Sequence, residues 1–115
     1  MPQIIEFLNS AGVSPFARWR EKLDPATRSR VTVAVLRLEA GNFSAVKGAG
    51  EGIYELRMDF GPGYRVYFGK DGEDLVILLG GGTKKRQEAD IKAAQALWQE
   101  YKRTKRRGDG AHKKV

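Results

Sequence analysis

The sequence contains no cysteine and only one histidine, His112, close to its C-terminus. Without cysteine the chain has no disulfide scaffold, no thiol nucleophile and no cysteine-ligated zinc or iron–sulfur site. A single histidine excludes catalysis by a histidine pair and multi-histidine metal sites, so we expect neither a metal nor a small-molecule cofactor. The sequence also lacks an apolar run of about 18 residues and the features of a signal peptide. We therefore expect a cytoplasmic protein with no membrane partner.

Positive charge is what the sequence has in excess. Its 115 residues carry 21 Lys and Arg against 14 Asp and Glu, a net charge of +7. RNA or DNA is the first partner that such a balance suggests, while a solubilising tail and an acidic protein partner stay open as explanations. The charge is uneven, because residues 102–115 hold seven basic residues and one acidic residue. The rest of the chain is nearly neutral, so a local basic cluster matters more than the total.

The length suits one domain, and no repeat or internal linker divides the sequence. We predict a single domain over residues 1–104 and a basic, flexible tail over residues 105–115. Apolar alternation and turn residues predict strands at residues 2–8, 53–60, 64–68 and 75–79. The last of these is apolar at every position, which indicates that it is covered on both faces or by a partner.

Helix-start signals precede two apolar-periodic segments. Ser14 and Asp24 are suitable N-caps, each followed by a proline at the first helical position. They predict helices at residues 14–23 and 24–41, and an apolar stripe predicts a last helix over residues 87–105. Residues 41–52 are rich in glycine and are expected to be a loop. The predicted fold class is α+β, with the order β-α-α-β-β-β-α, a small antiparallel sheet, two N-terminal helices on one face and a C-terminal helix.

Turn lengths give a predicted register for the strands. A three-residue turn over residues 61–63 would pair Asp59 with Arg65 and Arg57 with Tyr67. A two-residue Asp-Gly turn at residues 71–72 would pair Tyr67 with Val76 and Arg65 with Leu78, and the glycines at residues 80–82 would end the third strand. The face under the two early helices would then hold Tyr54, Leu56, Met58, Phe60, Tyr64, Val66, Phe68, Leu75, Ile77 and Leu79. Val76 and Leu78 would lie on the other face, covered by the last helix or by a partner.

The same register gathers cations on that second face. Arg57 and Arg65 would be diagonal neighbours with Tyr67 beside both, and the basic residues Lys84, Lys85 and Arg86 follow the third strand. Two guanidiniums with nearby lysines could form an anion site. The alternative is a solvated sheet face on which Arg65 pairs with Asp59, and Arg57 pairs with Glu55 or Asp59.

Three segments of the chain resemble a known group of proteins. They are Gly52–Arg57, Gly61–Phe68 and Gly80–Lys85, found in the predicted order of strands and helices. Together they resemble the RelE/ParE-type toxins of bacterial toxin–antitoxin modules, in the HigB-like branch of phage-derived addiction-module killer proteins. The similarity covers residues 3–104, and it implies a RelE/ParE-like fold and a helix-turn-helix antitoxin as partner.

The resemblance also implies a chemistry and a set of site residues. RelE- and HigB-like members cut mRNA on the ribosome, without metal, by attack of a 2′-hydroxyl on the adjacent phosphate. By position, Arg65 matches the family's catalytic arginine, Arg57 matches the basic residue of the preceding strand, and Lys84 and Lys85 match the basic pair after the last strand. Lys47 resembles the family's basic-glycine stretch, and with Arg86 it is expected to bind RNA.

The general base is not fixed by the resemblance, because the family's tyrosine after the basic pair and its histidines are missing from this domain. Tyr67, a lysine, Glu55 or Asp59 could take the role, and the nearby cations are expected to lower lysine and tyrosine pKa values. ParE-like members share the fold but act on DNA gyrase without cutting RNA. A non-toxic nucleic-acid-binding protein of phage origin is a further alternative.

Overall fold

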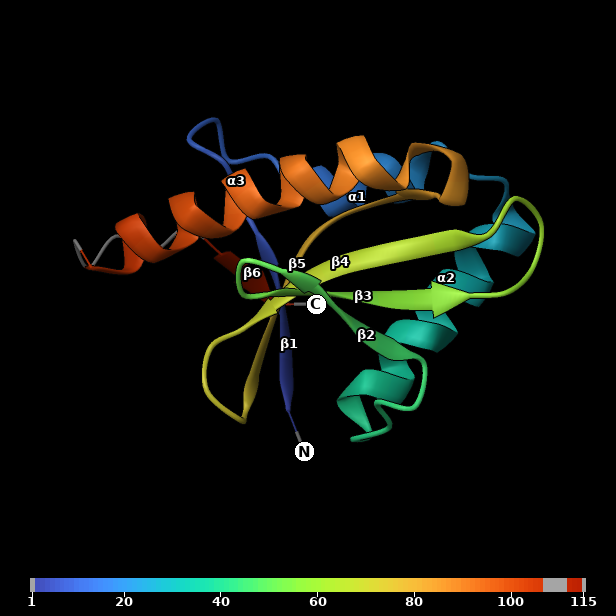
Figure 1. Cartoon of the computed structure of the whole chain (residues 1–115), viewed down its shortest axis with the longest axis horizontal. Coiled ribbons are helices and arrows are strands. Elements are labelled where there is room, and N and C mark those ends of the chain that lie inside the picture. The colour runs from blue at the N-terminus through green and yellow to red at the C-terminus, as the bar shows by residue number, and fades with distance from the viewer. Residues whose placement is uncertain (1, 107–111, 115) are drawn as a thin grey trace.

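The computed structural model describes residues 2–106 and 112–114 and has an α+β architecture (Figure 1). Its elements, in chain order, are β1 (Gln3–Phe7), α1 (Pro15–Glu21), α2 (Pro25–Glu39), β2 (Val46–Gly50), β3 (Ile53–Met58), β4 (Tyr64–Lys70), β5 (Leu75–Thr83), the 3-10 turn η1 (Lys84–Arg86), α3 (Gln87–Arg106) and β6 (His112–Lys114). α1 and α2 pack on one face of the sheet and α3 packs on the other. Each face therefore has its own apolar core, and the three predicted helices are confirmed.

The two early helices begin at the predicted caps. The Ser14 hydroxyl accepts a hydrogen bond of 3.0 Å from the Ala17 N–H, and the Asp24 carboxylate accepts one of 3.2 Å from the Thr27 N–H. Prolines occupy the first turn of both helices, where a missing N–H is harmless. After α2 the chain turns at Gly41, whose φ of +87° is easily reached only without a side chain.

The sheet is mixed, with strand order β2-β3-β4-β5-β1-β6, so the prediction of a small antiparallel sheet is wrong. β1 runs parallel to β5, while the other neighbouring strands are antiparallel. The connection from β1 to β5 includes α1 and α2, which cover one face of the sheet. Within the predicted tail, α3 continues to Arg106 and β6 pairs with β1, whereas residues 107–111 and 115 lie outside the described residues.

The segment expected to be a loop, residues 41–52, contains strand β2. It joins β3 through a two-residue turn at Glu51 and Gly52, both of which have positive φ, as in a type I′ hairpin turn. The two-residue turn predicted at residues 71–72 does not form. Instead β4 and β5 are joined through Asp71–Leu75, closed by a 2.9 Å hydrogen bond from the Asp71 N–H to the Leu75 carbonyl.

That longer connection changes which face each β5 residue occupies. Lys70 lies opposite Val76, so the pairing differs from the predicted register by an odd number of residues as far as the bulge between Tyr67 and Phe68. Such a shift turns the side chains of this part of β5 to the opposite face. Val76 and Leu78 lie in the core beneath α1 and α2, and Ile77 and Leu79 lie beneath α3, the reverse of the prediction. Coverage of β5 on both faces is confirmed. β5 also continues through the three glycines expected to end it.

Glycines let three helical side chains sit directly on the sheet backbone. A Cβ placed on Gly69 would lie 2.3 Å from the Trp98 ring, and one on Gly81 would lie 2.3 Å from the Trp19 ring. A Cβ on Gly82 would overlap the Asp90 carboxylate of α3. α3 and α1 can therefore pack closely against the sheet only because these positions carry no side chain.

We predict that Gly69→Ala destabilises the fold by about 1–3 kcal/mol or more, since overpacking displaces the buried indole of Trp98. Gly80→Ala is the matched control, because a Cβ there meets nothing within 4 Å, and it should change stability by less than about 0.5 kcal/mol. Urea denaturation followed by circular dichroism measures both. Equal midpoints for the two variants would show that α3 does not need the gap at Gly69.

Candidate nucleic-acid interface

The predicted site residues lie on the face of the sheet that α3 covers. Arg57 of β3 lies directly opposite Arg65 of β4, and Glu55 lies opposite Tyr67, so the predicted pairing is wrong by two residues. The turn between the strands is five residues long, not three, which accounts for the shift. Because the shift is even, all four side chains keep the predicted face.

Arg65 is buried, with 3% of its surface exposed, and is neutralised by an equally buried carboxylate. Its Nε lies 3.7 Å from Glu55 Oε2, which also accepts a 2.9 Å hydrogen bond from the side-chain amide of Gln87 at the start of α3. The expected pair between Arg65 and Asp59 is absent from the described residues. Burial and pairing make Arg65 a fixed cation, held by two strands and a helix.

The turn at Gly63 brings Arg65 next to Lys84. The Lys84 N–H donates a 2.8 Å hydrogen bond to the Gly63 carbonyl. A Cβ placed on Gly63 would lie 3.2 Å from the Lys84 Cβ and 3.8 Å from Arg65 Nη1. The guanidinium edge of Arg65 therefore reaches the start of η1, just beneath the basic run of residues 84–86.

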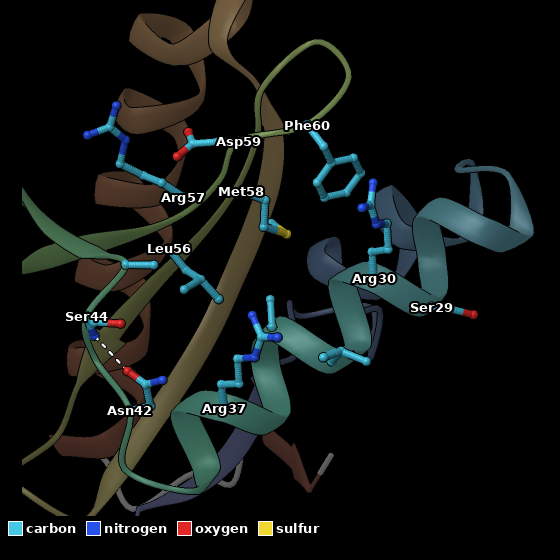
Figure 2. A pocket seen from close by; sticks show the side chains of 13 residues that line it. Ser29, Arg30, Arg37, Asn42, Ser44, Leu56, Arg57, Met58, Asp59 and Phe60 are labelled. Carbon is cyan, nitrogen blue, oxygen red and sulfur yellow. Dashed lines mark hydrogen bonds between the residues drawn. The ribbon is translucent and has the colours of Figure 1, made fainter.

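Exposed cations surround this buried arginine. The basic rim consists of Lys47 on β2, Arg57 on β3, and Lys84, Lys85 and Arg86 on η1. Lys47 lies opposite Glu55, and Figure 2 shows the Arg57 side chain pointing away from α2. Among the described residues only Arg86 of this rim has an ion pair, at 3.9 Å from Asp90. The other four side chains of the rim have no ion pair among the described residues, so their charges are available to an anion.

Tyr67 is almost fully buried, and its hydroxyl has no hydrogen-bond partner in the described part of the chain. Burial, followed by the negative charges of Glu55 and Asp90, raises the pKa of Tyr67 to about 12. The expectation that neighbouring cations would lower this pKa is wrong, because desolvation and two carboxylates outweigh Arg65. Near neutral pH the phenol of Tyr67 is therefore protonated.

Asp90 is a residue that the sequence analysis missed. Its Oδ2 is buried without a partner, and burial raises the pKa of this carboxyl, partly opposed by Arg86. With Tyr67, Trp19 and Gly81 it lines a cavity of about 150 Å³ between α1 and α3. The sequence feature that could have indicated this position of Asp90 is Gly82, because a residue without a side chain leaves room for the carboxylate on the sheet.

The described residues contain no cluster of three potential metal-ligating His, Cys, Asp or Glu side chains. Within the same part of the chain, no helix is long and apolar enough to cross a membrane. The polar groups of this candidate interface are thus the buried Arg65–Glu55 pair, the basic rim, and the Tyr67 hydroxyl and Asp90 carboxyl at the small cavity.

We predict that Tyr67→Phe keeps or slightly raises stability at pH 7, within about 1 kcal/mol, because it removes a buried hydroxyl that has no partner. Tyr101→Phe is the control, because its hydroxyl donates a 3.0 Å hydrogen bond to Asp71, and its loss should cost about 1–2 kcal/mol. Urea denaturation at pH 7 distinguishes the two. A larger loss for Tyr67→Phe would reveal a partner for that hydroxyl.

The same two variants test how the stability of the fold depends on pH in the alkaline range. Both tyrosines have a folded-state pKa raised to about 12, above the unfolded value near 10. Their contribution to stability is therefore complete below pH 10 and is lost as pH rises through 12. Each variant should flatten the fall in stability between these pH values, and an unchanged slope would contradict the raised pKa.

The sequence also matches proteins of one family. The family model described as Phage derived protein Gp49-like (DUF891) matches residues 18–102, which include the whole basic rim and the Arg65–Glu55 pair. An uncharacterized protein of Haemophilus influenzae is 44% identical over 86 residues, which cover 74% of this chain and 87% of that protein. The chain belongs to the phage-derived Gp49-like family.

Proposed function

We propose that this chain is the toxin of a type II toxin–antitoxin module and that it cuts mRNA on the ribosome. Membership of the phage-derived Gp49-like family supports a toxin, and the resemblance of residues 3–104 to RelE/ParE-type killer proteins points to the same function. The observation that carries the proposal is the exposed basic rim above the buried Arg65. A cognate helix-turn-helix antitoxin would restrain the toxin in the cytoplasm.

In the proposed reaction, the bond from the ribose O2′ to phosphorus forms while the bond from phosphorus to the 5′-oxygen breaks. The 2′-hydroxyl gives its proton to a base, and the departing 5′-oxygen takes a proton from water. A dianionic pentacoordinate phosphate lies between the two states, and cations fixed in advance stabilise it most strongly. Arg65 supplies the fixed cation, and Arg57, Lys84 and Lys85 bind and neutralise the phosphates around it.

The proton transfers are assigned from burial and contact. Tyr67 remains protonated near neutral pH, so its proposed role is donation of a hydrogen bond and not removal of the 2′-proton. Of the two carboxylates considered as bases, Glu55 contacts Arg65, and no ion pair of Asp59 is found in the described residues. Glu55 is therefore the proposed proton acceptor.

Access to Arg65 requires a local movement in this proposal. The side chain is only 4% exposed, and the neighbouring η1, which begins at Lys84, is a single turn without a side-chain cap. Displacing η1 would uncover the guanidinium while leaving the sheet intact. Binding to the ribosome would orient the RNA and supply the energy for that displacement, which explains why such a site would be weak on free RNA.

We predict that Arg65→Lys reduces mRNA cleavage by about 100-fold or more, since lysine keeps the buried charge opposite Glu55 but loses the planar fork. The double variant Lys84→Ala/Lys85→Ala should weaken cleavage with its fold intact, because both side chains are exposed. Primer extension on total RNA after induction in bacteria, without antitoxin, measures cleavage. Lys22→Ala, an exposed lysine at the end of α1, is the control and should cleave normally.

Other outcomes would replace this proposal. Growth arrest with DNA damage and intact mRNA would favour the ParE-like alternative, in which the target is DNA gyrase. Normal growth after induction of folded protein would favour a non-toxic nucleic-acid-binding role. Full cleavage by both site variants would move the active site away from the rim.

A further inference from the structure

A groove under α2 lies across the sheet from most of the basic rim, and Arg57 is the one rim residue among those that line it. It has a volume of about 420 Å³ and runs between α2 and the end of β3 (Figure 2). Its position separates it from Arg65, since α2 and α3 pack on opposite faces of the sheet. Of the residues used in the mechanism proposed above, Arg57 alone lines this groove, and its side chain points away from α2 (Figure 2).

The groove has an apolar floor that continues onto an exposed part of α2. Leu56 and Met58 of β3 point from the sheet toward α2 in Figure 2. Val33 lines the same groove and is 48% exposed. It and Leu36, 51% exposed on the same helix, are the large apolar side chains that the described part of the chain leaves open to solvent. An apolar strip of this kind gains free energy when a partner covers it.

Two arginines border this apolar strip. Arg30 and Arg37 are seven residues apart on α2, so they lie on one side of the helix about 10.5 Å apart along its axis. Both line the groove, and neither has an ion pair in the described structure. The Arg30 guanidinium lies 4.0 Å from the centre of the Phe60 ring, which holds it at one end of the groove.

Nearby acidic charge does not neutralise these two arginines. The one carboxylate among the lining residues, Asp59, points away from α2 in Figure 2, beside Arg57. The α2 side of the groove is therefore an apolar surface with two positive charges about two helical turns apart, neither of them in an ion pair of the described residues. This pattern is complementary to a segment that carries apolar side chains between two carboxylates.

We propose that this groove is a docking site for an acidic amphipathic helix of a protein partner. Carboxylates seven residues apart on the partner would pair with Arg30 and Arg37, and apolar side chains between them would cover Val33 and Met58. A second copy of this chain fits poorly, because each copy carries a net charge of +7 and presents the same positive groove. RNA fits poorly too, because its sugar–phosphate backbone would leave the aliphatic floor without an apolar partner.

The test selects binders from a displayed library of random 14-residue peptides, using the intact protein as the target. The expected result is enrichment of peptides with acidic residues seven apart and apolar residues between them. Titration of the enriched peptide should then show binding at least about tenfold weaker for Arg30→Ala/Arg37→Ala and for Val33→Glu. Arg18→Ala, an exposed arginine on α1, is the matched control and should bind as the unmodified chain does.

Four outcomes would overturn the docking proposal. The first is enrichment of basic or purely apolar peptides, and the second is equal peptide binding by Arg30→Ala/Arg37→Ala. The third is a loss of single-stranded RNA binding in that double variant while its peptide binding is unchanged. The fourth is a dimer of this chain that Val33→Glu dissociates. Primer extension distinguishes a failure of this docking proposal from a failure of the proposed nuclease activity. The groove variants should cleave mRNA at the normal level, because they leave the basic rim and Arg65 intact.

Discussion

Close approach of side chains to bare backbone is the constraint on which the rest of this structure depends. Two tryptophans and an aspartate lie directly on glycines of β4 and β5, so α1 and α3 can settle against the sheet with almost no gap. α3 consequently covers Tyr67, its Gln87 contacts Glu55, and Arg65 is left with 3% of its surface exposed. The electrostatics of the site follow from this packing, because burial raises the pKa of both Tyr67 and Asp90.

The buried pair and the exposed rim divide two tasks. Arg65 and Glu55 are removed from water together, so the cation is held in place at the cost of desolvating two charges. The rim lysines and arginines stay hydrated and can adjust to a phosphate backbone. In the proposed nuclease this division would suit an RNA that the ribosome positions, since one fixed cation would face the reacting phosphate and the rim would supply only attraction.

Local signals predicted the local structure well. The caps at Ser14 and Asp24 act on the N–H groups three residues later, so they can be recognised from a few letters of sequence. The β4–β5 register could not be predicted in this way. The Asp71 carboxylate binds Tyr101 and Lys105 of α3, and such long-range contacts override the short-range preference of Asp-Gly for a tight turn.

The partner of Arg65 was missed for a related reason. A turn two residues longer than expected moved Asp59 away and left Glu55 diagonal to the arginine, although the face was right. The β2 strand was missed because its glycines resemble a loop when read one by one, whereas pairing with β3 makes them a strand. Turn rules therefore placed these residues on the right face of the sheet but opposite the wrong neighbours.

The parallel pairing of β1 with β5 has a consequence for how the chain is made. Gln3 and Leu75 are about 70 residues apart, and β1 lies between β5 and β6 in the sheet. A nascent chain therefore has no partner for its first strand until most of the protein has left the ribosome. Closing so long a loop is slow, so the sheet is completed only near the end of synthesis. The basic run of residues 84–86 follows β5 in the chain, so the basic rim is also completed only late in synthesis.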